Sequence, residues 1–269
     1  MTMRPAAILH AVVHAVLRAL VFVWLVAAAP AFANSLQSYG VIFLHGKGGW
    51  AGAFDGGILS SLRREGAKVA APEMPWSFSR KYGATYEEAM SEIDREVVAL
   101  RAQGASKIIV IGHSLGANAA IGYAARRAVA AVVALSPGHL PETVEMQGRT
   151  AQAIEEARQL IAAGHGHVPK FFPDMVQGIP IPCTATPTIY LSMFAPDGPA
   201  VIPKNVVAMG PVPFLWVVGR LDPIHWRGPD YAFNRGAGHP KSKYLEVFAG
   251  HVLTPLTARG DVVDWIKSL

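Results

Sequence analysis

Cysteine, charge and internal repetition are all scarce in this sequence. Cys183 is the single cysteine among 269 residues, so no disulfide can form within the chain, and its stability must come from a buried core. Only 16% of the residues are charged and 51% are hydrophobic, which excludes a disordered, highly charged protein. The 26 glycines and 20 prolines follow no repeat, which excludes collagen-like and solenoid architectures.

Acidic residues are missing from residues 1–33, which contain two arginines and an apolar run from Ala19 to Ala29. The segment ends in Ala31-Phe32-Ala33, the small-x-small pattern of a signal-peptidase site. An uncleaved membrane anchor is the alternative, but about 11 strongly apolar residues fall short of the roughly 20 that span a bilayer. We therefore expect residues 1–33 to be a signal peptide, Asn34 to begin the mature chain, and the protein to be periplasmic or secreted without a membrane anchor.

A basic block with interleaved aromatic residues, as nucleic-acid-binding proteins carry, is also missing. The formal net charge is +5, and it becomes +3 when residues 1–33 are removed with their two arginines. This balance is too mild to indicate a nucleic-acid partner. Nothing in the sequence indicates an oligomeric state.

Short β-rich runs alternate with helical patterns through the rest of the chain. The continuous apolar runs Ile108–Ile111 and Val129–Leu135 are typical of strands that are covered on both faces. Further strands are expected at Gly40–Leu44, Lys68–Ala71, Phe214–Val218 and Tyr244–Phe248. This alternation predicts an α/β fold, with a mostly parallel sheet of about six strands flanked by helices.

Two helices are marked by their ends and by apolar spacing. Thr85 and Glu88 form a capping-box pattern, and apolar residues follow it at intervals of four and three until Gly104 ends the helix. Near the carboxyl terminus, Pro255 can open a helix whose apolar stripe includes Val262 and Ile266.

The stretch between Pro137 and Val212 interrupts the alternation. It contains a helical pattern at residues 152–162, followed by a Pro/Gly-rich region from Gly164 to Pro213. This is too long for an ordinary connection, and it has too few periodic apolar positions for a core of its own. We expect a cap insertion, at about residues 138–212, over the carboxyl ends of the strands of one domain spanning residues 34–269.

The sequence Gly112-His113-Ser114-Leu115-Gly116 directly follows an apolar strand run and precedes a small-residue helix. G-x-S-x-G in this setting is typical of a nucleophile elbow, in which a tight turn exposes the serine hydroxyl at a helix N-terminus. The flanking positions are glycine because side chains would clash in such a turn. A chance glycine-rich turn is the alternative. We expect Ser114 to be a nucleophile.

A serine nucleophile needs a base, which a carboxylate orients. Asp222 follows the fifth strand run and His251 follows the last one, in the chain order serine, acid, histidine that this architecture uses. His239 is a competing base, but it precedes the last strand and should lie away from the carboxyl edge. Asp261 and Asp264 compete with Asp222 and are expected on the solvated face of the last helix.

Oxyanion donors are expected in His45-Gly46-Lys47-Gly48-Gly49, which follows the first strand. The backbone N–H groups of Lys47 and Leu115 are the expected pair, and the Lys47 side chain is not required. The alternative is a phosphate-binding loop, but the Walker A pattern G-x-x-x-x-G-K-[ST] is absent.

Aromatic residues on loops at the expected strand ends are candidates for an apolar substrate pocket or for packing alone: Trp50, Phe54, Trp76 and Trp226. His165 and His167 lack the further ligands of a metal site, so we expect no metal and no other cofactor.

The motifs HGKGG, GHSLG, GRLDP and AGH resemble those of α/β hydrolases of the serine esterase and lipase type, and the resemblance extends over about Gly40 to Leu269. It implies that Ser114 attacks a carbonyl to form an acyl-enzyme, His251 shuttles the proton and Asp222 orients His251. It also implies that the N–H groups of Lys47 and Leu115 hold the oxyanion. Only a few residues separate the expected cleavage site from Gly40, so we expect the first antiparallel strands of the full fold to be missing.

The resemblance implies a small-molecule or polymeric ester as substrate. The same catalytic groups also serve thioesterases, amidases and peptidases, because all of these reactions transfer an acyl group. A binding protein that has lost catalysis is an alternative from another class, although the intact set of Ser114, Asp222 and His251 argues against it.

Overall fold

The computed structural model describes residues 36–236 and 238–269, and residues Leu36–Leu269 form one compact unit. The expected signal peptide, residues 1–33, and its cleavage point before Asn34 lie outside the described residues. Among the residues that are described, no helix is both long and apolar enough to cross a membrane.

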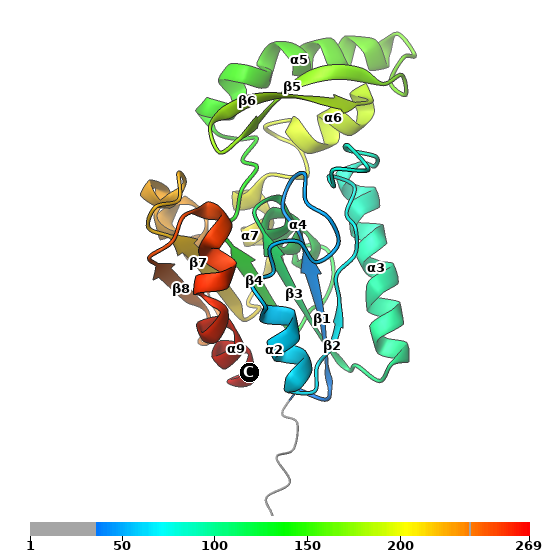
Figure 1. The fold of residues 1–269 in the computed structure, drawn as a ribbon. Helices are drawn as coiled ribbons and strands as arrows, with labels where there is room; N and C mark the ends of the chain where they lie inside the picture. Colours follow the sequence, from blue (N-terminus) through cyan, green and yellow to red (C-terminus); the bar gives the residue numbers. More distant parts are fainter. Residues whose placement is uncertain (1–35, 237) are drawn as a thin grey trace, which may run out of the picture. The chain divides into compact units, whose positions relative to one another are not determined.

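A six-stranded parallel sheet forms the centre of this unit (Figure 1). Its order is β2-β1-β3-β4-β7-β8. The strands are β1 Tyr39–Leu44, β2 Lys68–Ala70, β3 Lys107–His113, β4 Ala131–Leu135, β7 Phe214–Gly219 and β8 Lys243–Val247. Every strand run expected from the sequence is present, so the prediction of a parallel α/β sheet is confirmed.

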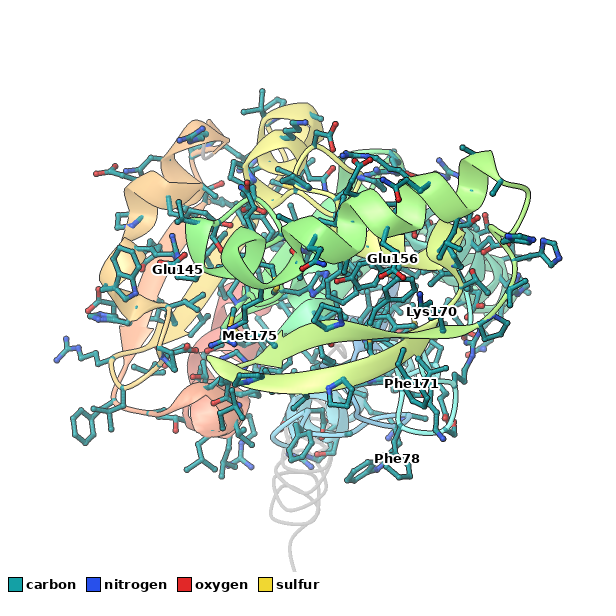
Figure 2. All side chains as sticks on the ribbon, turned by 90° about the horizontal axis from the view of Figure 1, so that it is seen from above. Phe78, Glu145, Glu156, Lys170, Phe171 and Met175 are labelled. Atoms are coloured by element: carbon teal, nitrogen blue, oxygen red, sulfur yellow. The ribbon has the colours of Figure 1, made fainter. Side chains whose placement is uncertain are left out.

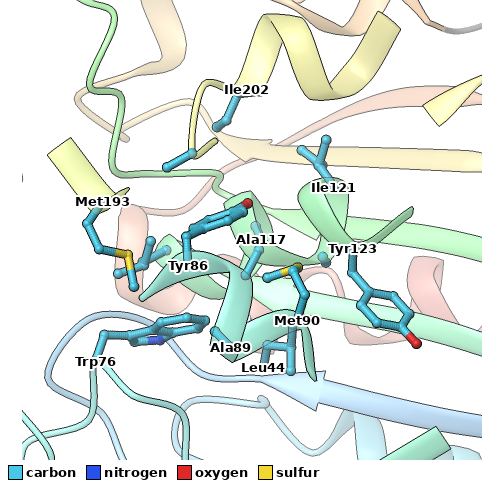
Figure 3. Close-up of a cluster of buried hydrophobic side chains, with 14 of the residues drawn as sticks. Leu44, Trp76, Tyr86, Ala89, Met90, Ala117, Ile121, Tyr123, Met193 and Ile202 are labelled. Atoms are coloured by element: carbon cyan, nitrogen blue, oxygen red, sulfur yellow. The ribbon is translucent and has the colours of Figure 1, made fainter. Parts of the chain in front are cut away.

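The two faces of the sheet are buried against different helices because successive side chains of a strand point to opposite sides. Ile42 and Leu44 of β1 pack in a cluster with helices α3 (Tyr86–Ala102) and α4 (Leu115–Ala124). Figure 3 shows part of this cluster, with Tyr86 and Met90 of α3 near Ala117 of α4. Val41 and Phe43 pack on the other side, with helices α2 (Ile58–Arg64) and α9 (Arg259–Lys267).

Helix α3 confirms the prediction made from its ends. The Thr85 hydroxyl accepts a hydrogen bond from the Glu88 N–H at 3.2 Å, and the Thr85 N–H donates to the Glu88 carboxylate at 2.7 Å. Gly104, just beyond the helix, has a φ of 90°, a conformation that glycine adopts without strain. The carboxyl-terminal helix differs from expectation, because it divides at Ala258 into α8 (Thr254–Thr257) and α9.

The first and larger part of the segment between β4 and β7 forms a layer at the carboxyl ends of the strands (Figure 1). It consists of α5 (Val144–Ala162), an antiparallel hairpin of β5 (Lys170–Val176) and β6 (Ile179–Ala185), and α6 (Pro187–Phe194). We call these elements the cap. The aromatic rings of Phe172, Tyr190 and Phe194 stack in series and belong to the same buried cluster as α3 and α4.

Shorter elements complete the fold. They are α7 (Ile202–Met209) and the 3₁₀ turns η1 (His225–Arg227), η2 (Pro229–Tyr231), η3 (Phe233–Arg235) and η4 (His251–Leu253).

The sheet order places the candidate site. From β1 the chain moves to β2 on one side, whereas from β3 it moves to β4 on the other. In open parallel sheets the crevice for a ligand lies outside the carboxyl ends of the strands at such a reversal. The loop after β1 contains Lys47, and the turn after β3 contains Ser114.

Candidate active site

Ser114 occupies the turn between β3 and α4 with φ 57° and ψ −120°, a left-handed conformation that is strained for a residue with a side chain. The turn can form because both flanking positions are glycine. A Cβ on Gly112 would lie 2.0 Å from the Gly116 carbonyl oxygen, and a Cβ on Gly116 would lie 2.0 Å from the Leu44 carbonyl oxygen. The tight packing of these backbones holds the Ser114 hydroxyl at the end of the sheet.

Three side chains predicted from the sequence lie in one hydrogen-bonded chain. The His251 Nε2 atom is 2.9 Å from the Ser114 hydroxyl, and its Nδ1 atom is 2.8 Å from an Asp222 carboxylate oxygen. Asp222 follows β7, and His251 opens η4 after β8. With Asp222 ionised, His251 donates from Nδ1–H and leaves the Nε2 lone pair free to accept from the Ser114 O–H.

The pKa of the Asp222 carboxyl lies below its ordinary value although the side chain is buried. Burial raises its pKa, but hydrogen bonds from His251 and Ser136, together with the Ile224 N–H at 3.1 Å, outweigh this effect and lower the pKa overall. Ser136 follows β4, and its hydroxyl oxygen lies 3.0 Å from the Thr254 hydroxyl oxygen as well. The sequence did not indicate Ser136 as a partner of the carboxylate.

A second histidine fixes the position of the His251 backbone. The His113 Nε2–H donates to the His251 carbonyl oxygen at 3.0 Å, and the two rings are 5.1 Å apart between centroids. Burial, followed by the charge of His251, lowers the pKa of His113 to about 4. His113 is therefore neutral at physiological pH and acts as a hydrogen-bond donor.

The loop after β1 approaches Ser114 closely, because a Cβ on Gly46 would lie 3.0 Å from the Ser114 Cβ. Hydrogen bonds hold this loop to the segment 74–76. The Trp76 indole N–H donates to the His45 carbonyl at 2.8 Å, and the Gly48 N–H donates to the Trp76 carbonyl at 2.8 Å. The Met74 N–H donates to His45 Nε2 at 3.0 Å. Lys47 thus lies in a rigid loop beside Ser114.

Leu115 is the first residue of α4, where backbone N–H groups have no acceptor within the helix. The expected oxyanion donors, Lys47 N–H and Leu115 N–H, therefore belong to the two backbone segments that flank the Ser114 side chain.

A cavity of about 190 Å³ opens beside Ser114 and His251. Residues of the main domain and of the cap line it together. Its exposed surface is mostly apolar, although the charged side chains of Lys47, Glu145 and Arg227 also line it. The cap supplies Met146, Met175 and the hairpin turn Gln177-Gly178, and the main domain supplies Leu140, Ile224 and Trp226.

Of the four aromatic residues expected at a substrate pocket, Trp226 lines this cavity, whereas Trp50, Phe54 and Trp76 do not. Trp76 lines a neighbouring cavity instead. Trp76 is only 1% exposed because its indole packs in the core and bonds to His45. Trp50 and Phe54 contact each other, with ring centroids 5.7 Å apart, on the outer side of His113. The position of a residue on a loop does not fix the direction in which its side chain points.

The competing residues lie elsewhere. His239 precedes β8, where its Nδ1 accepts from the Lys241 N–H at 3.1 Å. Asp261 and Asp264 are exposed on α9, and His165 and His167 are exposed in the cap. Within residues 36–236 and 238–269, no group of histidine, cysteine and acidic side chains could hold a metal ion.

Two ion pairs that the sequence did not indicate join the cap to the main domain. The Lys47 ammonium lies 2.5 Å from the Asp174 carboxylate of β5, and Arg227 lies 2.8 Å from Glu145 of α5. Both partners in each pair are distant in sequence. The one available signal was an acidic residue, Asp174, within an otherwise apolar run.

Comparisons with known proteins agree with this architecture. The model of the alpha/beta hydrolase family matches residues 41–265. Among solved structures, the chain is similar to a monoacylglycerol lipase from Paleococcus ferrophilus, with a TM-score of 0.65, 22% identity and coverage of 87% of this chain and 95% of that one. No curated protein matches the chain.

Two other solved structures are similar. A Pyrococcus furiosus esterase has a TM-score of 0.57 and 16% identity, and the match covers 87% of this chain and 83% of that one. A thioesterase domain from the curacin biosynthetic pathway has a TM-score of 0.51 and 16% identity, with coverage of 86% and 91%. At these identities the likeness concerns the fold.

Proposed function

Because the chain belongs to the α/β hydrolase family, we propose that it is a serine hydrolase that cleaves a carboxylic ester through an acyl-enzyme intermediate. The observation that carries the proposal is the hydrogen-bond chain from Asp222 through His251 to Ser114. The strained turn at Ser114 supports it, because such strain is costly and persists where a function requires it.

The proposed reaction has two halves. Ser114 Oγ attacks the ester carbonyl while its proton passes to His251 Nε2, and Asp222 stabilises the imidazolium that forms. The N–H groups of Lys47 and Leu115 donate to the oxyanion of the tetrahedral intermediate. His251 then protonates the departing alcohol, and the acyl-enzyme remains. A water molecule, deprotonated by His251, then attacks the acyl group. His251 passes that proton to Ser114 Oγ as the carboxylic acid is released.

The cavity supports a small-molecule substrate. A 150 Å³ apolar cavity in a protein can hold one benzene ring, so the cavity of about 190 Å³ beside Ser114 suits a single ring or a short chain. The side chains of Met146, Met175 and Trp226 would contact that group and favour an apolar one.

Replacement of the nucleophile tests the proposal. Ser114→Ala removes the attacking oxygen, so we expect ester turnover to fall by at least about 10⁴-fold while the protein stays folded. A fluorophosphonate should label the unmodified protein at Ser114 and leave the variant unlabelled. Ser60→Ala, on the exposed part of α2, is the matched control and should retain full activity. Unchanged turnover in Ser114→Ala would refute the proposal.

The type of acyl bond needs its own measurement. The names of the similar structures include a lipase and an esterase, which favours an ester, although a thioesterase domain shares the fold as well. Rates on matched ester, thioester and anilide substrates would decide, and the ester should have the highest kcat/KM.

We also propose that the protein is exported and that residues 1–33 are removed. The support is the sequence pattern that ends in Ala31-Phe32-Ala33. Amino-terminal sequencing of the protein purified from its native cells should begin at Asn34. A chain that keeps residues 1–33 and sediments with membranes would favour the anchor instead.

A further inference from the structure

The Lys47 side chain crosses from the main domain to the cap. Its ammonium donates to Asp174 Oδ1 at 2.5 Å and to the Met175 carbonyl oxygen at 3.0 Å. The side chain of Lys47 is 10% exposed and that of Asp174 is fully buried. Figure 2 shows the hairpin beside α5, with Met175 and Lys170 at opposite ends of β5.

The surroundings hold this pair in one arrangement. Asp174 accepts two more hydrogen bonds, from the Tyr82 hydroxyl at 2.9 Å and from the Met175 N–H at 2.6 Å. The Lys47 ammonium lies 5.6 Å from the ring centre of Phe194 and 6.0 Å from that of Tyr82. Separation of the pair would leave a buried charge without a partner, which is strongly unfavourable.

Backbone hydrogen bonds also fix the loop that carries Lys47. The backbone around Lys47 is held to the main domain by the hydrogen bonds of His45, Gly48 and Trp76 described above. The Lys47 side chain therefore connects β5 to a loop that is anchored in the main domain.

The same side chain lies between two cavities. Lys47 lines the cavity of about 190 Å³ beside Ser114, and it also lines a second cavity of about 290 Å³ between the loops and the hairpin. Asp174 lines the second cavity as well. The other walls of the second cavity are mostly apolar, and they include Trp76, Phe78, Tyr82, Ile181 and Cys183.

We propose that the Lys47–Asp174 ion pair is a specificity-determining wall, which limits the length of the substrate chain that can enter from Ser114. This inference rests on the proposed ester hydrolysis and deepens it. An alkyl chain that fills the first cavity meets the Lys47 side chain, whose ammonium is bound to the Asp174 carboxylate in the wall of the second cavity. It cannot displace them, because methylene groups offer neither charge a hydrogen bond. Beyond the wall, the apolar second cavity would accept the rest of a longer chain.

Two double variants separate the volume of the wall from its charge. Lys47→Ala/Asp174→Ala removes both charges and opens the passage, whereas Lys47→Met/Asp174→Asn removes both charges and fills nearly the same space. Neither variant leaves an unpaired buried charge, and both keep the backbone N–H of residue 47. The full chain is assayed with p-nitrophenyl esters from acetate to dodecanoate and with butanoate esters of alcohols of increasing length.

The unmodified protein should prefer butanoate over decanoate, or the short alcohol over the long one. Lys47→Ala/Asp174→Ala should raise the kcat/KM ratio of long to short chain by at least about tenfold in one of the two series. Lys47→Met/Asp174→Asn should change the ratio by less than about threefold. If Lys47→Ala/Asp174→Ala does not fold, Lys47→Ala/Asp174→Asn is assayed in its stead. This variant shortens only the side chain of residue 47 and also removes both charges.

Two results would overturn the proposal. One is equal kcat/KM for short and long chains in the unmodified protein in both series. The other is an unchanged ratio in a folded alanine pair that a fluorophosphonate still labels. Failure of the fluorophosphonate to label Ser114 in the unmodified protein would instead refute the proposed serine hydrolase function, so the two failures are distinguishable.

Discussion

At Asp222, burial and hydrogen bonding act in opposite directions on one carboxylate, and hydrogen bonding prevails. Asp222→Asn keeps the size of the side chain but removes the charge that favours the Nδ1–H form of His251. The imidazole then no longer presents its lone pair to Ser114, and we expect kcat to fall by about 10⁴-fold. Steady-state kinetics on a short p-nitrophenyl ester measures this loss.

Asp261→Asn is the control for that variant, because Asp261 is exposed on α9. It should leave kcat unchanged. A fall of less than about tenfold in Asp222→Asn would mean that another group orients His251.

The sequence was informative where a residue is fixed by its place at the end of a strand. Ser114, Asp222 and His251 each follow a β-run closely, and parallel strands bring these ends to one edge. The sequence was uninformative about side chains whose direction depends on distant contacts. The Lys47 ammonium and the Trp76 indole are examples, since their partners are Asp174 and the His45 carbonyl.

At the scale of an element, replacement of glycine by alanine should change the free energy of unfolding in opposite directions in two helices. Gly116 lies in the first turn of α4, where a Cβ would be 2.0 Å from the Leu44 carbonyl oxygen of β1. Gly148 lies in α5, where a Cβ would meet no atom within 4 Å. We expect Gly116→Ala to lower the free energy of unfolding by at least about 3 kcal/mol, since backbone must move.

Gly148→Ala is the matched substitution, and it should raise the free energy of unfolding by about 0.5–1 kcal/mol, because alanine loses less conformational freedom in a helix. Urea unfolding followed by circular dichroism measures both values. Equal effects of the two substitutions would contradict the close approach of α4 to β1.

The cap hairpin shows why one element was not predicted. Prolines at 173, 180 and 182 argue against strands, because proline cannot donate in a ladder. In a two-stranded hairpin every strand has a free edge, so a residue without an N–H is tolerated there. The one sequence signal for the turn is Gly178. Gln177 and Gly178 have φ values of 49° and 84°, as a two-residue hairpin turn of the primed type requires.

For the whole molecule, the burial of neutral histidines predicts sensitivity to acid. Burial lowers the pKa of His113 and that of His139 to about 4, from an ordinary value of 6.5. His139 is buried against Phe194, and its Nε2–H donates to the Met193 carbonyl oxygen at 2.8 Å. In the unfolded chain both rings are exposed and take up protons more readily.

The sign follows from proton linkage. Between pH 6.5 and pH 4 the unfolded chain binds more protons than the folded one at these two rings. The free energy of unfolding should therefore be fully retained above pH 6.5 and fall as the pH approaches 4, by up to about 3 kcal/mol for each histidine. Urea unfolding at about pH 7 and about pH 5 measures the fall.

His113→Gln and His139→Gln should each have a lower free energy of unfolding than the unmodified protein at neutral pH. That free energy should also depend less steeply on pH. His165→Gln, on the exposed cap surface, is the control and should keep the original slope. If all three variants keep that slope, the acid sensitivity of the fold arises from groups other than these two buried rings.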